Sequence, residues 1–277
     1  SGTVWNNQFS TVHPTLEVNT GFGSSVDISG DTVIVGAPSE QVGVNLNQGA
    51  AYVFSRTGTS WSVQQRLTAA DGFGAQNFGA SVSVSGETVA IGAGTNDFFV
   101  GSAYVFVRSG AVWTQQQKLS PADSDVGERF GFSLELDGDS VIVGASGDTI
   151  GANSNQGSAY VFERSGLIWT QIAKLIDPLG STDDQFGFSV AISGDRIIVG
   201  APFSDGPPPP LSKNLQPSAI DQGAVLVFAN QPFAPTAAAV SIGGRVTMDG
   251  RAALPNALVS FTDRDGNIRT ARTNSFG

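Results

Sequence analysis

The chain of 277 residues contains no cysteine, which excludes disulfide bonds, thiolate metal sites and a cysteine nucleophile. Histidine occurs once, as His13, so a metal site built from several histidines is also excluded. A Ser-His-acid triad would depend on this one side chain beside Pro14, which we interpret as structural. No serine lies in a nucleophile-elbow pattern, and the three lysines lie outside any phosphate-binding loop. The sequence therefore predicts a protein that is not an enzyme.

Charged residues make up only 14% of the chain and acids outnumber bases, so the formal net charge is −10. Phosphate backbones and anionic lipid headgroups are recognised by clustered Lys and Arg, which this chain lacks, so nucleic acid is not an expected partner. No apolar run approaches the roughly 18 residues of a spanning helix, so membrane insertion is not expected. The chain starts at Ser1 without a charged-then-apolar leader, which indicates a cut end.

Glycine is abundant, with 35 residues, and Phe-Gly pairs mark a repeat. Each pair opens a stretch of alternating apolar and small residues, which predicts a strand with one apolar face. A β-branched run ending in Gly-Ala follows, as in Val33-Ile-Val-Gly-Ala37, and predicts a strand buried on both faces. A short polar turn such as Gly30-Asp31 joins the two strands. The four pairs begin at Phe22, Phe78, Phe130 and Phe186.

A third predicted strand carries an aromatic run ending in Phe, and in three repeats a turn then leads to a lone Trp. All variation in length falls between the second and third strands, so insertions emerge on one face. Four antiparallel strands every 52 to 56 residues predict radially packed blades, and hence an all-β fold of the β-propeller class. We expect the Phe-Gly strands to be innermost and the strands of Trp61, Trp113 and Trp169 to be outermost.

The Phe-Gly opening and the Gly-Ala-Pro closure, as at Phe22-Gly23 and Gly36-Ala-Pro38, resemble FG-GAP repeats of the integrin α-like type. The resemblance spans residues 1–230, although two of the repeats lack the proline. It implies one four-stranded blade per repeat in a ring that usually has seven blades. It also implies a secreted or cell-surface, extracellular protein of the kind found in many bacteria.

Four repeats are fewer than seven, so we expect an open arc whose ends expose apolar side chains and favour aggregation. In an alternative, residues 4–9, which repeat the register of the Trp strands, pair with residues 225–228 and close a ring of four blades. Ser1-Gly2 matches the Ser-Gly turns of later repeats, which favours truncation inside a hairpin over natural closure.

The last part of the chain differs from the repeats in charge. Residues 237–277 carry three acids and five bases, whereas residues 1–236 carry 21 acids and nine bases. Pro232 and Pro235 mark a linker over residues 231–236. The sequence therefore predicts a first domain at 1–230 and a second at 237–277.

Alternating residues in the second domain predict three strands, at 240–246, 257–261 and 268–273, with a hairpin turn at 263–267. This pattern is similar to the beginning of carboxypeptidase regulatory-like domains. The similarity implies a partial prealbumin-like β-sandwich and does not imply peptidase activity.

Calcium has to be considered because integrin-type repeats commonly carry an Asp-x-Asp-x-Asp-Gly loop that supplies oxygen ligands. The nearest match is Asp123-Ser-Asp125 with Glu128, three carboxylates in the segment before Phe130. No other repeat carries the full set, and acids suit exposed turns without any ion. We therefore predict no bound cofactor, and we name Asp123, Asp125 and Glu128 as the residues that would hold calcium if it bound.

The repeats and the missing catalytic set predict a non-catalytic binding or scaffolding module. The variable loops on one propeller face are the expected contact surface for a partner protein, as in adhesion. The alternative is a carbohydrate-binding, lectin-like propeller in which Trp61, Trp113 and Trp169 present their rings to a glycan, although such residues more often pack between blades. A loop at 202–211 contains four consecutive prolines, which favour a stiff polyproline II segment at the surface.

Overall fold

The computed structural model describes residues 6–7, 9–94, 100–205 and 223–230, together with the backbone of residues 258–262 and 268–272. The chain divides into two compact units, Ser1–Asn230 and Gln231–Gly277. All regular elements of the described residues are strands. Accordingly, none of these residues belongs to a helix that could cross a bilayer.

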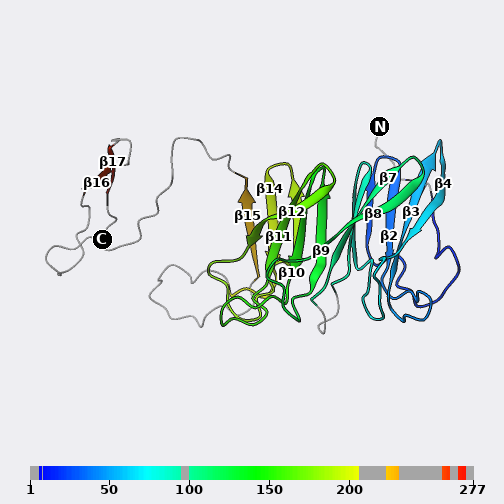
Figure 1. Cartoon of the computed structure of the whole chain (residues 1–277), viewed down its shortest axis with the longest axis horizontal. Coiled ribbons are helices and arrows are strands. Elements are labelled where there is room, and N and C mark those ends of the chain that lie inside the picture. The colour runs from blue at the N-terminus through cyan, green and yellow to red at the C-terminus, as the bar shows by residue number, and fades with distance from the viewer. Residues whose placement is uncertain are drawn as a thin grey trace. The chain divides into compact units, whose positions relative to one another are not determined.

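Three sheets of four antiparallel strands and one sheet of three make up the first unit (Figure 1). Each sheet joins its strands in chain order and contains one sequence repeat, so we call the sheets blades 1 to 4. The predicted all-β propeller architecture is confirmed. The strands are β1 (Val26–Ser29), β2 (Thr32–Ala37), β3 (Ala50–Thr57) and β4 (Ser60–Leu67) in blade 1; β5 (Ser81–Ser85), β6 (Thr88–Gly92), β7 (Ala103–Ser109) and β8 (Val112–Leu119) in blade 2; β9 (Phe130–Asp137), β10 (Ser140–Ala145), β11 (Ser158–Ser165) and β12 (Ile168–Leu175) in blade 3; and β13 (Ser189–Ser193), β14 (Arg196–Ala201) and β15 (Ala224–Ala229) in blade 4.

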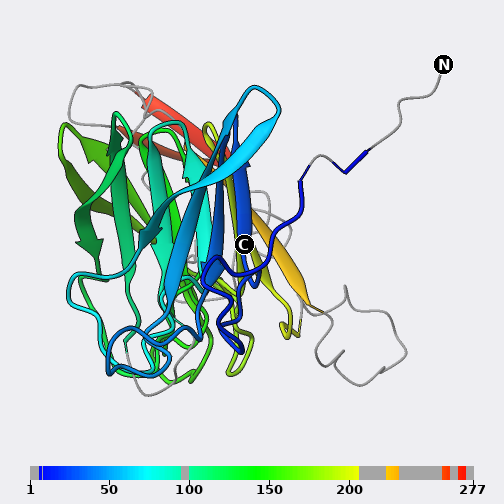
Figure 2. The ribbon, with the colours of Figure 1, turned by 90° about the vertical axis from the view of Figure 1, so that its right-hand side faces the viewer.

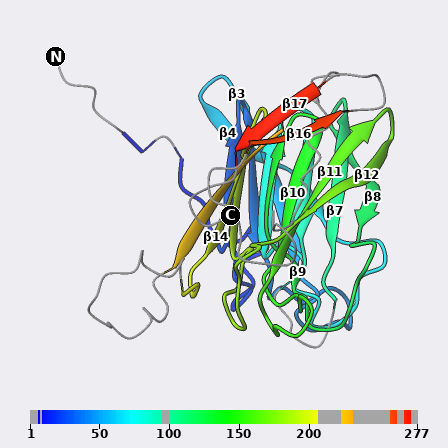
Figure 3. The ribbon, with the colours of Figure 1, turned by 90° about the vertical axis from the view of Figure 1, so that its left-hand side faces the viewer.

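The first strand of each blade is innermost. Strand β5 contacts β1 and β9 extensively, and β9 likewise contacts β13, whereas the fourth strands β4, β8 and β12 barely meet. Figures 2 and 3 show the sheets side by side from two opposite directions. The Phe-Gly strands are therefore innermost and the Trp strands outermost, as the sequence predicts.

Hydrogen bonds between side chains and main-chain groups join each innermost strand to the next. The Ser25 hydroxyl donates to the carbonyl of Gly79 over 2.8 Å. The Asp27 carboxylate accepts a hydrogen bond from the Val84 amide over 2.7 Å. Equivalent bonds recur between blades 2 and 3, from Ser81 to Gly131 and from Leu136 to Ser83, and between blades 3 and 4, from Ser133 to Gly187 and from Ile192 to Glu135.

Two glycines allow this close approach. A Cβ atom on Gly144, at the end of β10, would lie 2.0 Å from the carbonyl oxygen of Gly187 in the next blade. Gly187 itself has a φ of +89°, which side chains rarely adopt. The Gly of Gly-Ala and the Gly of Phe-Gly are therefore two halves of one contact between blades.

The outer strands contain a β-bulge that the sequence did not reveal. The register of β3 against β4 shifts between Val53 and Phe54, which leaves Gln64 as the extra residue. The side-chain oxygen Oε1 of Gln64 accepts a hydrogen bond from Trp113 Nε1 of the next blade over 2.9 Å. The bulge thus directs a polar side chain to the indole of the neighbouring blade, and Gln116 and Trp169 repeat the bond at 2.8 Å.

The blades do not close into a ring, and both ends of the arc expose apolar side chains, as predicted. Val26 and Ile28 are exposed on blade 1, and Val225 and Val227 are exposed on blade 4. Trp5 lies outside the described residues, so pairing of its strand with β15 stays untested.

In the second unit, β16 (Leu258–Thr262) pairs antiparallel with β17 (Ile268–Arg272). These strands correspond to the second and third predicted strands of this unit. The predicted strand at 240–246 and the turn at 263–267 lie outside the described residues, as does the proline-rich stretch 206–211.

The glycine contact yields a test with a matched control. Gly144→Ala should lower the free energy of unfolding by about 3 kcal/mol, because the new methyl group displaces the backbone of blade 4. Gly200→Ala, at the same position of blade 4, would place its Cβ 2.4 Å from the Ser189 hydroxyl, which can rotate away. Urea unfolding of both variants should show a loss below about 1 kcal/mol for Gly200→Ala. Equal losses would contradict this account of the glycines.

Candidate functional site

Among the described residues of the first unit, the long connections lie at one end, and we call it the loop face. It consists of the connections between second and third strands and the segments that lead into first strands, and it lies at the lower end in Figure 2. The opposite end carries only tight turns such as Gly30-Asp31. The loop face is therefore the part of the blades where side chains vary without disturbing the sheets.

Neighbouring blades hold the loops of this face in place. Gly49, at the end of the long loop of blade 1, forms a parallel bridge with Phe78 of blade 2. The Asn153 amide in the loop of blade 3 donates to the carbonyl of Gly180 over 3.0 Å, and Gln156 donates to that of Asp177 over 2.8 Å. The loops are thus ordered before any partner arrives, which reduces the entropy that binding would cost.

A polar cluster lies beneath the loop face of blade 3. Tyr160 of β11 donates its hydroxyl to Asp123 over 3.1 Å and lies 3.2 Å from Asp148. The Lys174 ammonium of β12 lies 2.6 Å from Asp123 and 2.8 Å from Asp148. The Ser158 hydroxyl donates to Asp148 over 2.5 Å. The two carboxylates come from different loops, so the cluster fastens both loops to the sheet.

Blade 2 repeats the arrangement with one carboxylate. Tyr104 donates to Asp71 over 2.9 Å, and Lys118 lies 2.6 Å from the other oxygen of the same carboxylate. The Gln76 side chain donates to the Tyr104 hydroxyl over 2.5 Å. The acid in this blade comes from the segment that leads into the first strand.

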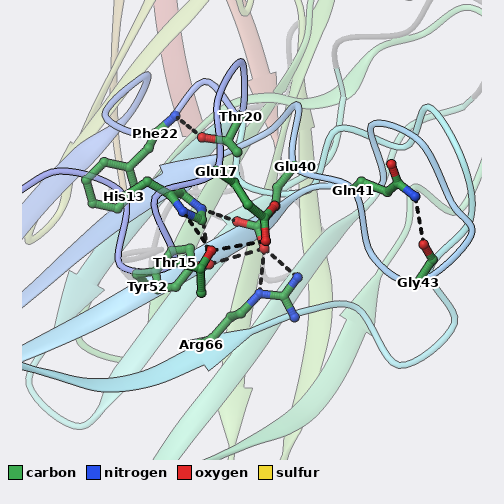
Figure 4. Close-up of polar contacts among 10 residues, drawn as sticks. All are labelled: His13, Thr15, Glu17, Thr20, Phe22, Glu40, Gln41, Gly43, Tyr52 and Arg66. Atoms are coloured by element: carbon green, nitrogen blue, oxygen red, sulfur yellow. Dashed lines mark hydrogen bonds and ion pairs between the residues drawn. The ribbon is translucent and has the colours of Figure 1, made fainter.

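Blade 1 contains a variant of the cluster with a histidine (Figure 4). Glu40 is buried, and Arg66 lies 2.5 Å from its Oε1. His13 Nε2 lies 2.8 Å from Glu40 Oε2, and the Tyr52 hydroxyl donates to Oε1 over 3.2 Å. The Thr15 hydroxyl, 3.1 Å from His13 Nδ1, donates to Glu17 over 3.0 Å. This cluster holds the N-terminal segment against blade 1.

The electrostatics of the clusters indicate structural rather than catalytic groups. Burial, with a contribution from Glu40, raises the pKa of Tyr52 to about 12. Burial alone would lower the pKa of Lys174, but its hydrogen bonds to Asp123 and Asp148 raise it overall. Tyr52 and Lys174 therefore keep their protons near neutral pH, and neither is poised to act as a general base.

The three candidate calcium ligands take different positions. Asp123 is paired with Lys174 and Tyr160. Asp125 accepts a hydrogen bond from the Val126 amide over 3.0 Å, and its own amide donates to Glu128 Oε1 over 2.5 Å. Glu128 is buried, and one of its carboxylate oxygens is buried without a hydrogen-bond partner. The set as arranged does not fit calcium, which takes about six to eight oxygens, and we derive no role through that ion.

The surroundings of Glu128 favour the protonated form of its carboxyl. Burial raises the pKa of its carboxyl from 4.5 to about 7, the Asp125 amide opposes this rise, and the charges of Asp148 and Asp123 add to it. Gln76 occupies the same position in blade 2, two residues before the Phe-Gly pair. The fold thus accommodates a neutral side chain where Glu128 stands.

Within the part of the chain that the structure describes, one group of metal-ligand type has all its donor atoms within 4.8 Å of one another: His13, Glu17 and Glu40. Glu40 and His13 already pair with each other, and Arg66 balances the charge of Glu40. We therefore interpret the group as an ion-pair network that fastens the chain. The sequence did not indicate Glu40, although Lys or Arg stands 14 residues after each Tyr and could have revealed the clusters.

The tryptophans differ in exposure. Trp113 and Trp169 are buried between blades, whereas Trp61 is only partly buried. Arg56, Arg108 and Arg164 lie over the three rings, 5.3–5.7 Å from the centroids. Two of the three rings proposed for glycan stacking are therefore not accessible.

A groove of about 720 Å³ lies on the loop face of blade 1. Three of the side chains that line it, Leu16, Val18 and Leu46, are apolar and exposed. Polar residues, among them Glu17 and Gln41, complete the lining. An exposed apolar cluster with a polar rim is typical of protein-binding surfaces.

Comparison with known protein families identifies one match. The FG-GAP repeat profile matches residues 17–54, 61–106, 113–162 and 169–228, which together exceed half of the chain. Each matched segment contains the first three strands of one blade, and the last three segments also contain the fourth strand of the preceding blade. No curated protein matches the chain.

The environment of Glu128 generates a prediction about pH. The pKa of Glu128 is raised in the folded protein, so its protonated carboxyl stabilises the fold. This stabilisation is fully present below the pKa that Glu128 has in the unfolded chain, and it is lost as pH rises through 7. Glu128→Gln imitates the protonated acid, so it should raise the free energy of unfolding by about 1–3 kcal/mol near pH 8 and change it little near pH 4.

Urea unfolding at the two pH values, with the exposed Glu163→Gln as control, measures the effect. The same measurements with added calcium and with a chelator test whether Glu128 binds calcium. If Glu128→Gln lowers stability only when calcium is present, the carboxylate is a calcium ligand and our interpretation of it is wrong.

Proposed function

Because the chain belongs to the FG-GAP repeat family, we propose that it is a non-catalytic module that binds another protein through its loop face. FG-GAP repeats suggest protein-protein or adhesion-type binding, and propellers of these repeats are generally non-catalytic. The proposal places the partner's apolar side chains against Leu16, Val18 and Leu46, which line the groove together with polar residues. The groove is the single observation that carries it.

Two features support the choice of this surface. The loops around the groove are held by hydrogen bonds to the segment that leads into the next blade, as when the Ala75 amide donates to the carbonyl of Leu46 over 2.8 Å. The long loops and their apolar side chains also lie at one end of the blades, so a partner can touch several loops at once. Exposed apolar side chains among polar ones, on loops that are ordered in advance, are features of a protein-binding surface.

An extracellular or cell-surface location belongs to the same proposal, since FG-GAP repeats are typical of such proteins. We also propose that the blades form part of a seven-bladed ring, and that residues 237–277 begin a carboxypeptidase regulatory-like domain. The β16–β17 hairpin supports the last point, because it joins two of the strands that the resemblance implies.

One observation favours the alternative of glycan binding. A pocket of about 290 Å³ on the loop face of blade 2 is lined by Phe73, Gln76, Lys118, Ser120 and Ser124. The Gln76 side-chain oxygen is buried there without a hydrogen-bond partner. An aromatic ring beside amide and hydroxyl groups is a combination that can hold a sugar.

The proposal predicts which substitutions abolish binding. On arrays of purified extracellular proteins and of glycans, the chain should bind at least one protein. Val18→Ser with Leu46→Ser should weaken that binding about tenfold or more, because the apolar centre of the contact is lost. Leu167→Ser removes an equally exposed apolar side chain from the opposite end and should have no effect.

Binding to glycans alone would favour the alternative, and Phe73→Ser should then abolish it. Equal weakening by Leu167→Ser would contradict the assignment to the loop face. Circular dichroism of each variant separates lost binding from lost folding.

A further inference from the structure

Blades 1 and 3 carry an acid at the same position of the loop after the second strand. Glu40 stands three residues after the alanine that ends β2, and Asp148 stands three residues after the alanine that ends β10. Both side chains are buried. Each carboxylate lies within 2.8 Å of the cationic side chain of its own blade, Arg66 or Lys174. The acid at this position is therefore a regular part of the polar cluster.

Blade 2 has no acid at this position. The residue three places after the equivalent alanine, Ala93, is Asn96, which lies outside the described residues. The groups that bind the acid in blade 3 are nevertheless retained in blade 2, where Ser102, Tyr104 and Lys118 hold the positions of Ser158, Tyr160 and Lys174. Blade 2 thus has the partners of a carboxylate and an uncharged residue in place of the acid.

The pocket of about 290 Å³ on blade 2 lies among these partners, because Ser102 and Lys118 line it. In blade 3 the equivalent groups both contact Asp148: the Ser158 hydroxyl lies 2.5 Å from the carboxylate and the Lys174 ammonium lies 2.8 Å from it. The pocket therefore corresponds to the space that the Asp148 side chain fills in blade 3.

The charges around the pocket allow a carboxylate to enter. Lys174 pairs with two carboxylates, those of Asp123 and Asp148, whereas among the described residues Lys118 pairs with one, that of Asp71. The formal net charge of −10 repels anions from a distance. In physiological salt this repulsion is screened beyond about 8 Å, so the contacts inside the pocket decide the affinity.

Gln76 removes a conflict that exists in blade 3. Burial raises the pKa of Glu128, and the charge of Asp148 adds to the rise, so these two acids oppose each other. Gln76 holds the position of Glu128 in blade 2 and is only 3% exposed. Because its side chain is neutral, a carboxylate in the pocket meets no opposing charge from this position.

We propose that the pocket of blade 2 binds the carboxylate of a small ligand, an acidic sugar or an organic acid, in the place that Asp148 has in blade 3. The carboxylate accepts hydrogen bonds from Lys118 and Ser102. The pocket volume lies at the lower end of the range for small-molecule sites, which fits a ligand of this size. The inference does not depend on protein binding at the groove of blade 1, and it adds a charge to the ligand of the glycan alternative.

Titration of the ¹⁵N-labelled chain with sodium glucuronate, sodium acetate and glucose, at constant ionic strength, tests the proposal by NMR. The backbone amides of Gly101 and Ser102, which line the pocket, report binding. Glucuronate and acetate should shift both signals. Glucose should bind at least about tenfold more weakly than glucuronate, because it has the hydroxyl groups of a sugar but cannot form the charge-assisted hydrogen bond to Lys118.

Variants of the lysine identify the pocket as the site. Lys118→Gln should weaken glucuronate binding about tenfold or more. Lys118→Arg should retain it, because Arg66 holds the same position in blade 1 and binds Glu40 there. Arg56→Gln is the control for the change in net charge, since this arginine pairs with Asp31 at the opposite end of the blade. Circular dichroism confirms that each variant is folded.

Asp148→Ala tests the comparison of blades from the other side. Without its acid, blade 3 should acquire a second site, so the amides of Gly157 and Ser158 should respond to acetate in this variant and not in the unmodified chain. A response there without any at Gly101 and Ser102 would overturn the proposal, because the geometry would bind carboxylates while the pocket of blade 2 would not.

Equal affinity for glucose and glucuronate would also overturn the proposal, and so would binding that Lys118→Gln leaves unchanged. Glucuronate bound more tightly than acetate would identify an acidic sugar as the source of the carboxylate. Equal affinity for these two would identify an organic acid, in agreement with the proposal. None of these results changes the test of the groove, because Leu16, Val18 and Leu46 take no part in the pocket.

Discussion

The fold depends on the close approach of the backbones of neighbouring blades. They approach where the glycine near the end of a second strand meets the Phe-Gly pair of the next blade. At Gly144 and Gly187 the two backbones lie so close that even a methyl group cannot enter. This distance brings the innermost strands within reach of short side chains, so that Ser133 can bond to the carbonyl of Gly187. The angle between blades, and with it the position of every loop, follows from that contact.

The arrangement of the blades could be predicted because it depends on residues that recur. Phe-Gly pairs, β-branched runs and lone tryptophans indicated strand order, the inner and outer strands and the exposed ends of the arc. The same spacing indicated that Lys118 and Lys174 belong to the scaffold, where they pair with Asp71 and Asp123. Patterns of this kind are read directly from a sequence, since each repeat confirms the others.

What the sequence could not reveal depends on contacts between segments that are far apart in the chain. Glu40 appears as one more polar residue after a Gly-Ala-Pro turn, and only the folded chain brings it to His13 and Arg66. The bulge at Gln64 leaves no signal in the spacing, because the extra residue is present in every fourth strand described. Asp125 seemed equivalent to its neighbours as a ligand, yet its carboxylate caps a local amide.

The side-chain bonds between innermost strands connect each blade only to its immediate neighbours. Within the part of the chain that the structure describes, blades 2 and 3 are held on both sides, whereas blades 1 and 4 are held on one. Such a chain behaves as a row of coupled units, in which the free energy of opening is lowest at the ends and highest in the middle. Amide hydrogens at the two ends of the row therefore exchange with solvent through openings that leave the central blades intact, and unfolding proceeds inward from whichever end opens first.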